Sequence, residues 1–243
     1  GGNVTFTEGA GTDDTLVLAD GKDLTITTAS ANADITLPNV DGTNAGDGTD
    51  LTILAGTGNV SVKSIDTDIN DLRIDGTTIT LNGNITTAAF GGDAASIDIN
   101  NAGSGGVLLA SGNITLTSGN GTIDISGTVD SESGQNRTLT IASGSGATAI
   151  HKAIGGTTAL GALTVNAAGT GTIEINDIGD SDTLGVVTGV TAIGNADTHT
   201  LTLDGSTYKT DTAQTYTADR FTITAASTTA SITTTNDNVS FVD

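Results

Sequence analysis

The chain has no Cys, Met or Trp, and its 243 residues include one Pro and six aromatic residues. Without Cys there is neither a disulfide framework nor a thiolate site. The scarcity of large apolar side chains argues against a deep core or an enclosed ligand pocket. Small aliphatic residues still bury apolar area at ~25 cal/mol per Å² when a fold repeats and stacks them. We therefore expect an elongated repeat fold.

Basic residues are also scarce. Seven Lys and Arg stand against 28 Asp and Glu, which gives a formal net charge of −21. Nucleic acid and anionic membrane surfaces are poor partners for such a chain, because both require clustered basic side chains. No apolar run approaches the ~18 residues of a membrane span, so no transmembrane segment is predicted. The acidity keeps a β-rich chain soluble and makes divalent cations plausible ligands.

Threonine is abundant, with 48 copies, and many of them lie between two aliphatic residues. Because side chains alternate faces along a strand, each such triplet buries two aliphatic residues and exposes one hydroxyl. The Thr-centred triplets begin at residues 24, 35, 51, 79, 114, 139, 163, 201 and 221. In other triplets Ser, Asp or Glu takes the middle position, as in Val60-Ser61-Val62 and Ile173-Glu174-Ile175. The pattern predicts many short, half-buried strands.

Two all-β architectures fit these strands. Asp-Gly and Asn-Gly pairs such as Asp75-Gly76 and Asn120-Gly121 supply turns between them, and helix-favouring residues are rare. Strands that fold back as hairpins would give a β-sandwich. Strands that form the successive sides of a coil would give a parallel β-solenoid, or β-helix. Short strand cores, small-residue loops and missing aromatic anchors favour the solenoid. At ~20 residues per coil, the chain would form roughly 12 coils.

The composition changes near the C-terminus, and the two ends resemble each other. Residues 206–243 contain no Gly and four of the six aromatic residues, so we divide the chain into a solenoid body at 1–205 and terminal strands at 206–243. These strands are either a capping or docking segment, or further strands of the same core. Asn3-Val4-Thr5-Phe6 echoes Asn238-Val239-Ser240-Phe241. We predict self-association through residues of these end segments: Val4, Phe6, Tyr208, Tyr216, Phe221, Val239 and Phe241.

Two stretches resemble a known family. Residues 155–165 (GGTTALGALTV) and 206–223 (STYKTDTAQTYTADRFTI) are similar to repeats of filamentous-haemagglutinin and autotransporter-like giant bacterial surface proteins. The resemblance implies an extracellular β-solenoid stalk, fibre or adhesin segment without catalytic residues. A cysteine-free, acidic, Thr- and Gly-rich composition is also typical of prokaryotic surface layers and fibres.

Calcium is the small ligand that the sequence favours. Asp66, Asp68 and Asn70 follow the alternating acidic spacing that opens an oxygen-rich calcium loop, but the glycine and glutamate of an EF-hand are missing. Asp47 and Asp50 fit part of the nonapeptide that binds Ca²⁺ between the turns of β-rolls, and that motif requires tandem copies. The competing interpretation is that these Asp residues occupy solvent-exposed turns and bond their own backbone.

No catalytic constellation is evident. The two histidines, His151 and His199, lack metal-ligand spacing, and the basic residues are dispersed. We therefore expect no enzymatic activity, with a polysaccharide-active β-helix enzyme as a remote alternative. The sequence predicts an extracellular structural protein that associates head to tail into a filament, surface layer or adhesin stalk. An adhesin or calcium-stiffened spacer that contacts glycan or protein is the alternative.

Overall fold

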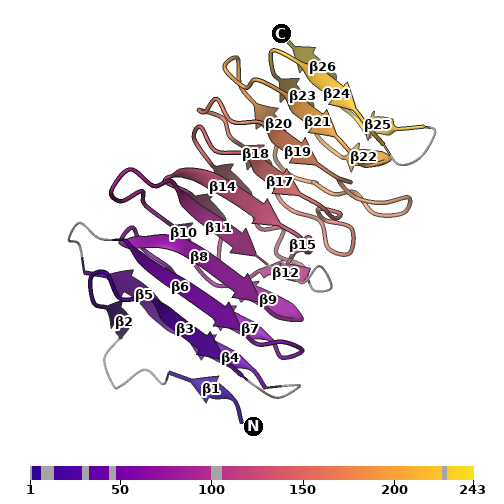
Figure 1. The fold of residues 1–243 in the computed structure, drawn as a ribbon. Coiled ribbons are helices and arrows are strands. Elements are labelled where there is room, and N and C mark those ends of the chain that lie inside the picture. The colour runs from indigo at the N-terminus through magenta and orange to yellow at the C-terminus, as the bar shows by residue number, and fades with distance from the viewer. Residues whose placement is uncertain (1, 7–13, 29–32, 44–47, 100–105, 226–228) are drawn as a thin grey trace.

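The chain winds into a parallel β-solenoid with three sheets along its sides (Figure 1). The computed structural model describes all residues except 1, 7–13, 29–32, 44–47, 100–105 and 226–228. Every ladder between named strands in the described part of the chain is parallel, which excludes the alternative β-sandwich. The described residues contain no helix, and so no helix that could span a membrane.

Each coil contributes one short segment to each of three sheets, here called sheets A, B and C. Sheet A contains β1 (Val4–Thr5), β4 (Ile35–Leu37), β7 (Val60–Val62), β9 (Thr78–Leu81), β12 (Gly106–Leu109) and β15 (Thr128–Ser131). Single bridges at Ile154 and Ile178 continue sheet A to β22 (Thr207–Thr210) and β25 (Ser231–Thr234). Sheet B begins with β2 (Thr15–Leu18) and β5 (Asn39–Gly42), and a bridge at Ile65 links them onward.

Sheet B then continues through β10 (Ile85–Thr86), β13 (Ile114–Thr117), β16 (Leu139–Ala142), β18 (Leu163–Val165), β20 (Thr191–Gly194), β23 (Gln214–Thr217) and β26 (Val239–Val242). Sheet C contains β3 (Leu24–Thr27), β6 (Thr49–Leu54), β8 (Ile69–Asp75), β11 (Ala95–Ile99), β14 (Asn120–Ile125), β17 (Thr148–Ile150), β19 (Ile173–Ile175), β21 (Leu201–Leu203) and β24 (Phe221–Ile223).

The nine strands of sheet C correspond to eight full turns between β3 and β24, fewer than the sequence estimate. The estimate was too high because the corners are longer than the triplets suggest. The stacked partners Ile123, Thr148 and Ile173, for example, follow one another at intervals of 25 residues. The chain after residue 205 continues all three sheets in parallel, so the terminal strands belong to the same stack as the body.

The aliphatic residues of the triplets form continuous rows inside the stack. Leu51, Leu72 and Ile97 are consecutive partners in sheet C, and each is at most 1% exposed. The polar middle residues alternate with them and face outward, as the alternation of buried and part-exposed positions in β6 and β11 shows. Such a row stabilises the fold only when every coil keeps its register, because a slip by one residue turns every side chain to the other face.

Asp and Asn side chains at the corners connect successive coils. The Asp23 carboxylate accepts the backbone N–H of Asp50 at 3.2 Å, and the Asp50 carboxylate accepts that of Asp71 at 3.1 Å. The Asp71 carboxylate in turn accepts the N–H of Ser96 at 2.7 Å. Asp50 and Ser96 lie at register shifts in the ladder of sheet C, between Thr49 and Leu51 and between Ala95 and Ile97. The carboxylates thus accept backbone N–H groups where the ladder is irregular.

Glycine allows close approach at one of the corners. Gly121, Gly146 and Gly171 are stacked in consecutive coils at the start of sheet C. A Cβ atom on Gly146 would lie 2.0 Å from the carbonyl oxygen of Gly121, and one on Gly171 would lie 1.8 Å from that of Gly146. No side chain fits at these distances, so glycine is required at these positions.

The hydrogen bonds that the Asp177 carboxylate accepts provide a test of the corner contacts. Its Oδ1 accepts the N–H groups of Ser206 and Thr207 one coil later, both at 2.7 Å. We expect Asp177→Ala to lower the free energy of unfolding by about 1–3 kcal/mol, because two part-buried donors lose their acceptor. Asp177→Asn retains an acceptor oxygen and should cost less than half as much.

Urea denaturation of the three proteins measures this difference, with Asp197→Ala at an exposed turn position as the control. Equal midpoints for Asp177→Ala and the control would show that the corner contacts do not stabilise the stack.

Candidate functional site: the open ends of the coil stack

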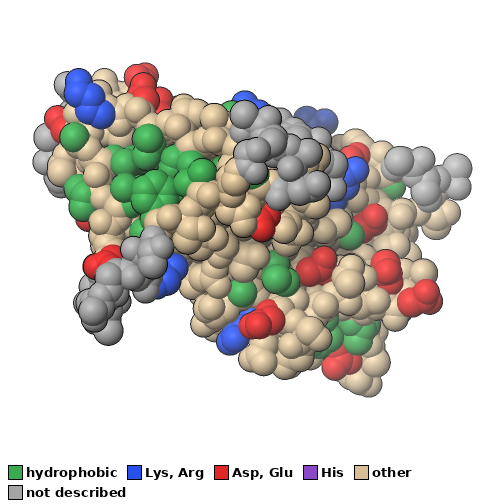
Figure 2. Space-filling view, turned by 90° about the horizontal axis from the view of Figure 1, so that it is seen from below, with side chains coloured by type: hydrophobic (Ala, Val, Ile, Leu, Met, Phe, Trp, Pro, Cys, Tyr) green, Lys and Arg blue, Asp and Glu red, His purple; other side chains and the backbone are tan. Residues whose placement is uncertain are grey.

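Among the described residues, no further coil covers the N-terminal end of the core. β1, β2 and β3 are the first strands of their sheets, so each has a strand neighbour on one side only. Val4, Leu16 and Leu24 belong to the inward rows of these strands, but they are only partly buried. Figure 2 views the molecule from the side on which the N-terminus lies in Figure 1 and shows apolar side chains gathered there.

The C-terminal end is open in the same way. β24, β25 and β26 are the last strands of sheets C, A and B. Ile223 follows Leu203 in its inward row and is 58% exposed, whereas Leu203 is 1% exposed. Phe241 follows Tyr216 and is 47% exposed, whereas Tyr216 is fully buried. The difference arises because no further coil covers the last one in the described structure.

The exposed apolar side chains are concentrated at the two ends. Among the described residues, seven large hydrophobic side chains are exposed, and Val190 is the only one outside the first and last coils. The other six are Phe6 and Val17 at one end, and Ile223, Val239, Phe241 and Val242 at the other. Isolated exposed hydrophobic residues are ordinary on protein surfaces, but groups at both ends of a polar rod indicate contact surfaces.

The aromatic residues of the last coils pack as a cluster. The rings of Tyr216 and Phe241 are stacked with centroids 5.1 Å apart, and Phe221 meets Phe241 edge-on at 5.2 Å. Val4 and Phe6 lie in the first coil, while Phe221, Val239 and Phe241 lie in the last, so the structure places these predicted residues at the two ends. A single subunit does not bring the two groups together.

Tyr208 and Tyr216 differ from the other predicted contact residues because both are fully buried. The Tyr208 hydroxyl donates to the carbonyl of Ile175 at 3.1 Å and accepts the N–H of Gly205 at 2.7 Å, and the Tyr216 hydroxyl donates to Gln214. Burial raises the pKa of both phenols above the usual value. These two tyrosines support the end coils from inside and do not form a contact surface.

Three end residues were missed by the sequence analysis: Leu16, Leu24 and Ile232. Each is partly buried against the core in a first or last strand. The sequence signal that could have identified them is that their strands lie nearest to the two termini. That signal was insufficient because assigning a strand to an end requires knowing which sheet it joins.

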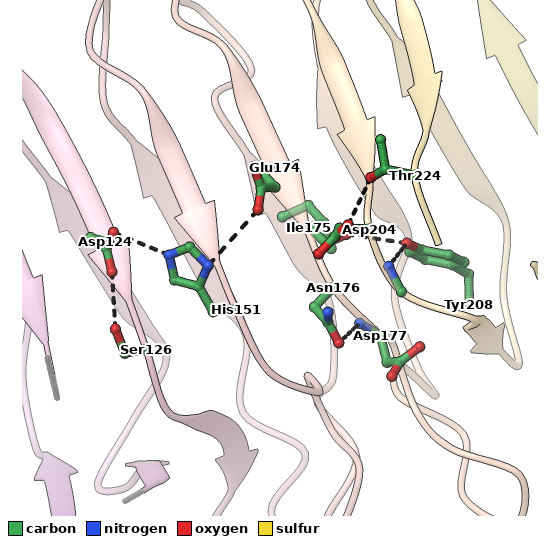
Figure 3. A network of polar contacts seen from close by, with 11 residues as sticks. Asp124, Ser126, His151, Glu174, Ile175, Asn176, Asp177, Asp204, Tyr208 and Thr224 are labelled. Atoms are coloured by element: carbon green, nitrogen blue, oxygen red, sulfur yellow. Dashed lines mark hydrogen bonds and ion pairs between the residues drawn. The ribbon is translucent and has the colours of Figure 1, made fainter. Parts of the chain in front are cut away.

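A separate, polar group of side chains lies on the outer side of sheet C (Figure 3). The Nε2 atom of His151 is 3.2 Å from Oδ2 of Asp124, and its Nδ1 atom is 3.9 Å from Oε1 of Glu174. The hydroxyl of Ser126 donates to Asp124 at 3.3 Å. In a serine hydrolase the imidazole lies between the hydroxyl and the carboxylate. Here the Asp124 carboxylate lies between the Ser126 hydroxyl and the His151 imidazole. The arrangement links side chains of three successive coils and does not place the imidazole where it could activate Ser126.

The structure describes four of the five predicted calcium ligands. Asp50 lies in β6 and accepts the N–H of Asp71, Asp66 accepts the N–H of Thr67 at 2.7 Å, and Asp47 lies outside the described residues. Asp68 lies in the turn before β8, and Asn70 is the second residue of β8. Within the described ranges, no group of three His, Cys, Asp or Glu side chains is arranged to hold a metal ion. Calcium binding therefore stays a prediction.

Comparison of the chain with family models, with curated proteins and with solved structures finds no match in any of the three. The resemblance to giant bacterial surface proteins thus rests on residues 155–165 and 206–223 alone.

Asp68 provides a test of the acidic turn. Partial burial and the nearby carboxylates of Asp41 and Asp66 raise its pKa. Because the folded state favours the protonated form, ionised Asp68 destabilises the fold at neutral pH. We expect Asp68→Asn to raise the thermal midpoint slightly at about pH 7, with the gain shrinking as the pH falls through the range in which Asp68 protonates.

Calcium can be tested with the same two proteins. If this turn binds Ca²⁺, the added ion should raise the thermal midpoint of the wild type more than that of Asp68→Asn, and a chelator should reverse the effect. Identical midpoints with calcium and with chelator would show that the calcium prediction is wrong.

Proposed function

We propose that this chain is an extracellular structural protein that associates head to tail into a filament, surface layer or adhesin stalk. The observation that carries the proposal is that the partly buried apolar residues packed against the core, Val4, Leu16, Leu24, Phe221 and Ile232, all lie in the first or last coils. A fold that leaves its core open at both ends offers two surfaces on which a further coil adds backbone and side-chain contacts.

The sides of the rod support the same role. Asp and Glu side chains occupy outward positions of sheet C, including Asp98, Asp124 and Glu174, and the chain carries a net charge of −21. Like charges repel, so lateral contact between rods is disfavoured relative to contact at the apolar ends. The resemblance of residues 155–165 and 206–223 to bacterial surface proteins, with the acidic, Thr- and Gly-rich composition, supports an extracellular location.

An adhesin or spacer that binds a glycan or a protein is the second candidate. The His151 site favours it, because it is a localised polar group on an otherwise repetitive side. Such a module would work as a monomer and would bind its partner through a side of the solenoid. The two candidates therefore differ in the state of the purified protein.

Assembly of the purified chain, measured by sedimentation velocity and electron microscopy, tests the proposal. We expect rods whose lengths are multiples of one subunit. Assembly should increase as salt rises from about 0.05 M to about 0.5 M, because screening weakens the repulsion between acidic subunits while apolar contacts persist. A protein that stays monomeric at every salt concentration would contradict the filament proposal and favour the binding module.

A further inference from the structure

We propose that a hollow on the side of the solenoid binds the carboxylate or sulfate group of an acidic saccharide. The hollow has a volume of about 400 Å³ and lies at the corner between sheets A and B, next to β4, β7, β9 and β12. That volume falls within the range of about 300–1,000 Å³ that is typical of small-ligand pockets. The proposal is independent of head-to-tail assembly and specifies a ligand for the second candidate function, the binding module.

The charge of this hollow differs from that of three other hollows on the described surface. Among the described residues that line it, Lys63 is the only charged one, and its side chain is half-buried. The other three hollows are lined by carboxylates, which belong to Asp130 and Glu132, to Asp98 and Asp124, and to Asp14. At ~0.15 M salt the Debye length is ~8 Å, so remote carboxylates of this acidic chain are largely screened. The local charge therefore favours an anion in this hollow.

The amide of Asn39 provides hydrogen-bond donors at this hollow. Its Oδ1 atom accepts the backbone N–H of Ser64 at 3.4 Å and the Ser64 hydroxyl at 2.9 Å. Because a backbone N–H only donates, the atom that faces it must be the amide oxygen, and this determines the orientation of the Asn39 amide. The Nδ2 group has no hydrogen-bond partner among the described residues. Its two N–H donors therefore remain for a ligand.

The amide of Asn82 is oriented in a similar way. Its Nδ2 atom donates to the carbonyl of Val62 at 3.2 Å and to the Ser61 hydroxyl at 3.1 Å. Its Oδ1 atom accepts the hydroxyl of Ser111 at 2.9 Å. Because Ser61 accepts the bond from Asn82, its own O–H is left as a donor. The protein thus uses the amide oxygens of Asn39 and Asn82 internally and leaves donors at the hollow.

This combination of donors and one cation matches an oxyanion. An ionised carboxylate or sulfate offers only acceptors, and hydrogen bonds to an ionised group are roughly twice as strong as those between neutral groups. The exposed hydroxyls of Thr36 and Ser111 also line the hollow, and each both donates and accepts. These two residues therefore suit the hydroxyl groups of a sugar. An acidic saccharide supplies both kinds of group in one ligand.

Isothermal titration calorimetry at ~0.15 M salt tests the class of ligand. The probes are an oligogalacturonate, a sulfated dextran oligosaccharide, a neutral dextran oligosaccharide of the same length and inorganic sulfate. We expect an acidic oligosaccharide to bind and the neutral one not to bind, and the acidic probe that binds identifies the group as carboxylate or sulfate. The proposal is overturned if neither acidic oligosaccharide binds, if neutral dextran binds equally, or if inorganic sulfate binds as tightly as the oligosaccharides.

Two variants test the location of the site. Asn39→Asp retains an acceptor oxygen for Ser64 but replaces the free donor group with a negatively charged oxygen, and Lys63→Gln removes the cation. Each variant should weaken binding of the acidic oligosaccharide by about 10-fold or more, because a charge-assisted contact is lost. Unchanged binding by both variants would show that the ligand does not occupy this hollow.

The matched control is Lys152→Gln, which makes the same change in net charge at an exposed position outside the hollow. This variant should bind the acidic oligosaccharide like the wild type, and urea midpoints check that every variant folds. Sedimentation velocity on the same proteins measures assembly separately, and assembly should be the same in all of them. Loss of the binding proposal therefore leaves the filament proposal standing, and the reverse also holds.

Discussion

The in-register stacking of identical inward positions in successive coils is the constraint on which the rest of this structure depends. Each aliphatic residue of a triplet is buried only because the coils before and after it place another side chain in the same row. The chain has no Trp and few aromatic residues, so no single large side chain could organise a core. The rows therefore replace a central core, and the parallel backbone ladder holds them in register.

Corner chemistry follows from this constraint. A coil must turn from one sheet to the next without disturbing the spacing between coils, and the turn interrupts the strand ladder. Asp side chains bridge the interruption by accepting backbone N–H groups of the next coil, as Asp34 does from Asn59 and Asp177 does from Ser206 and Thr207. Glycine permits the backbones of stacked corners to approach closely, as at Gly121 and Gly146. Much of the acidity of the chain thus has a structural use.

Nearest-neighbour stacking also makes the two ends different from the interior. An inner coil has a partner on both sides, whereas the first and last coils have one. Leu203 and Ile223 occupy the same row and differ in exposure only because of this position. The candidate site is therefore a consequence of the repeat itself: a row that buries residues by repetition exposes them wherever the repetition stops.

The sequence by itself determined the strand pattern, because the period of two in the triplets specifies which residues face inward whatever the fold. It also located Val4, Phe6, Phe221, Val239 and Phe241 in strands near the termini. Only the tertiary structure decided the rest. It showed that neighbouring strands pair in parallel and not as hairpins, that each coil is longer than the triplet spacing implies, and that Tyr208 and Tyr216 are interior residues. The reason is that register between coils is a non-local property. Whether Leu24 and Phe221, or Leu16 and Phe241, belong to the same inward row depends on the length of every intervening turn, and no local sequence pattern specifies it.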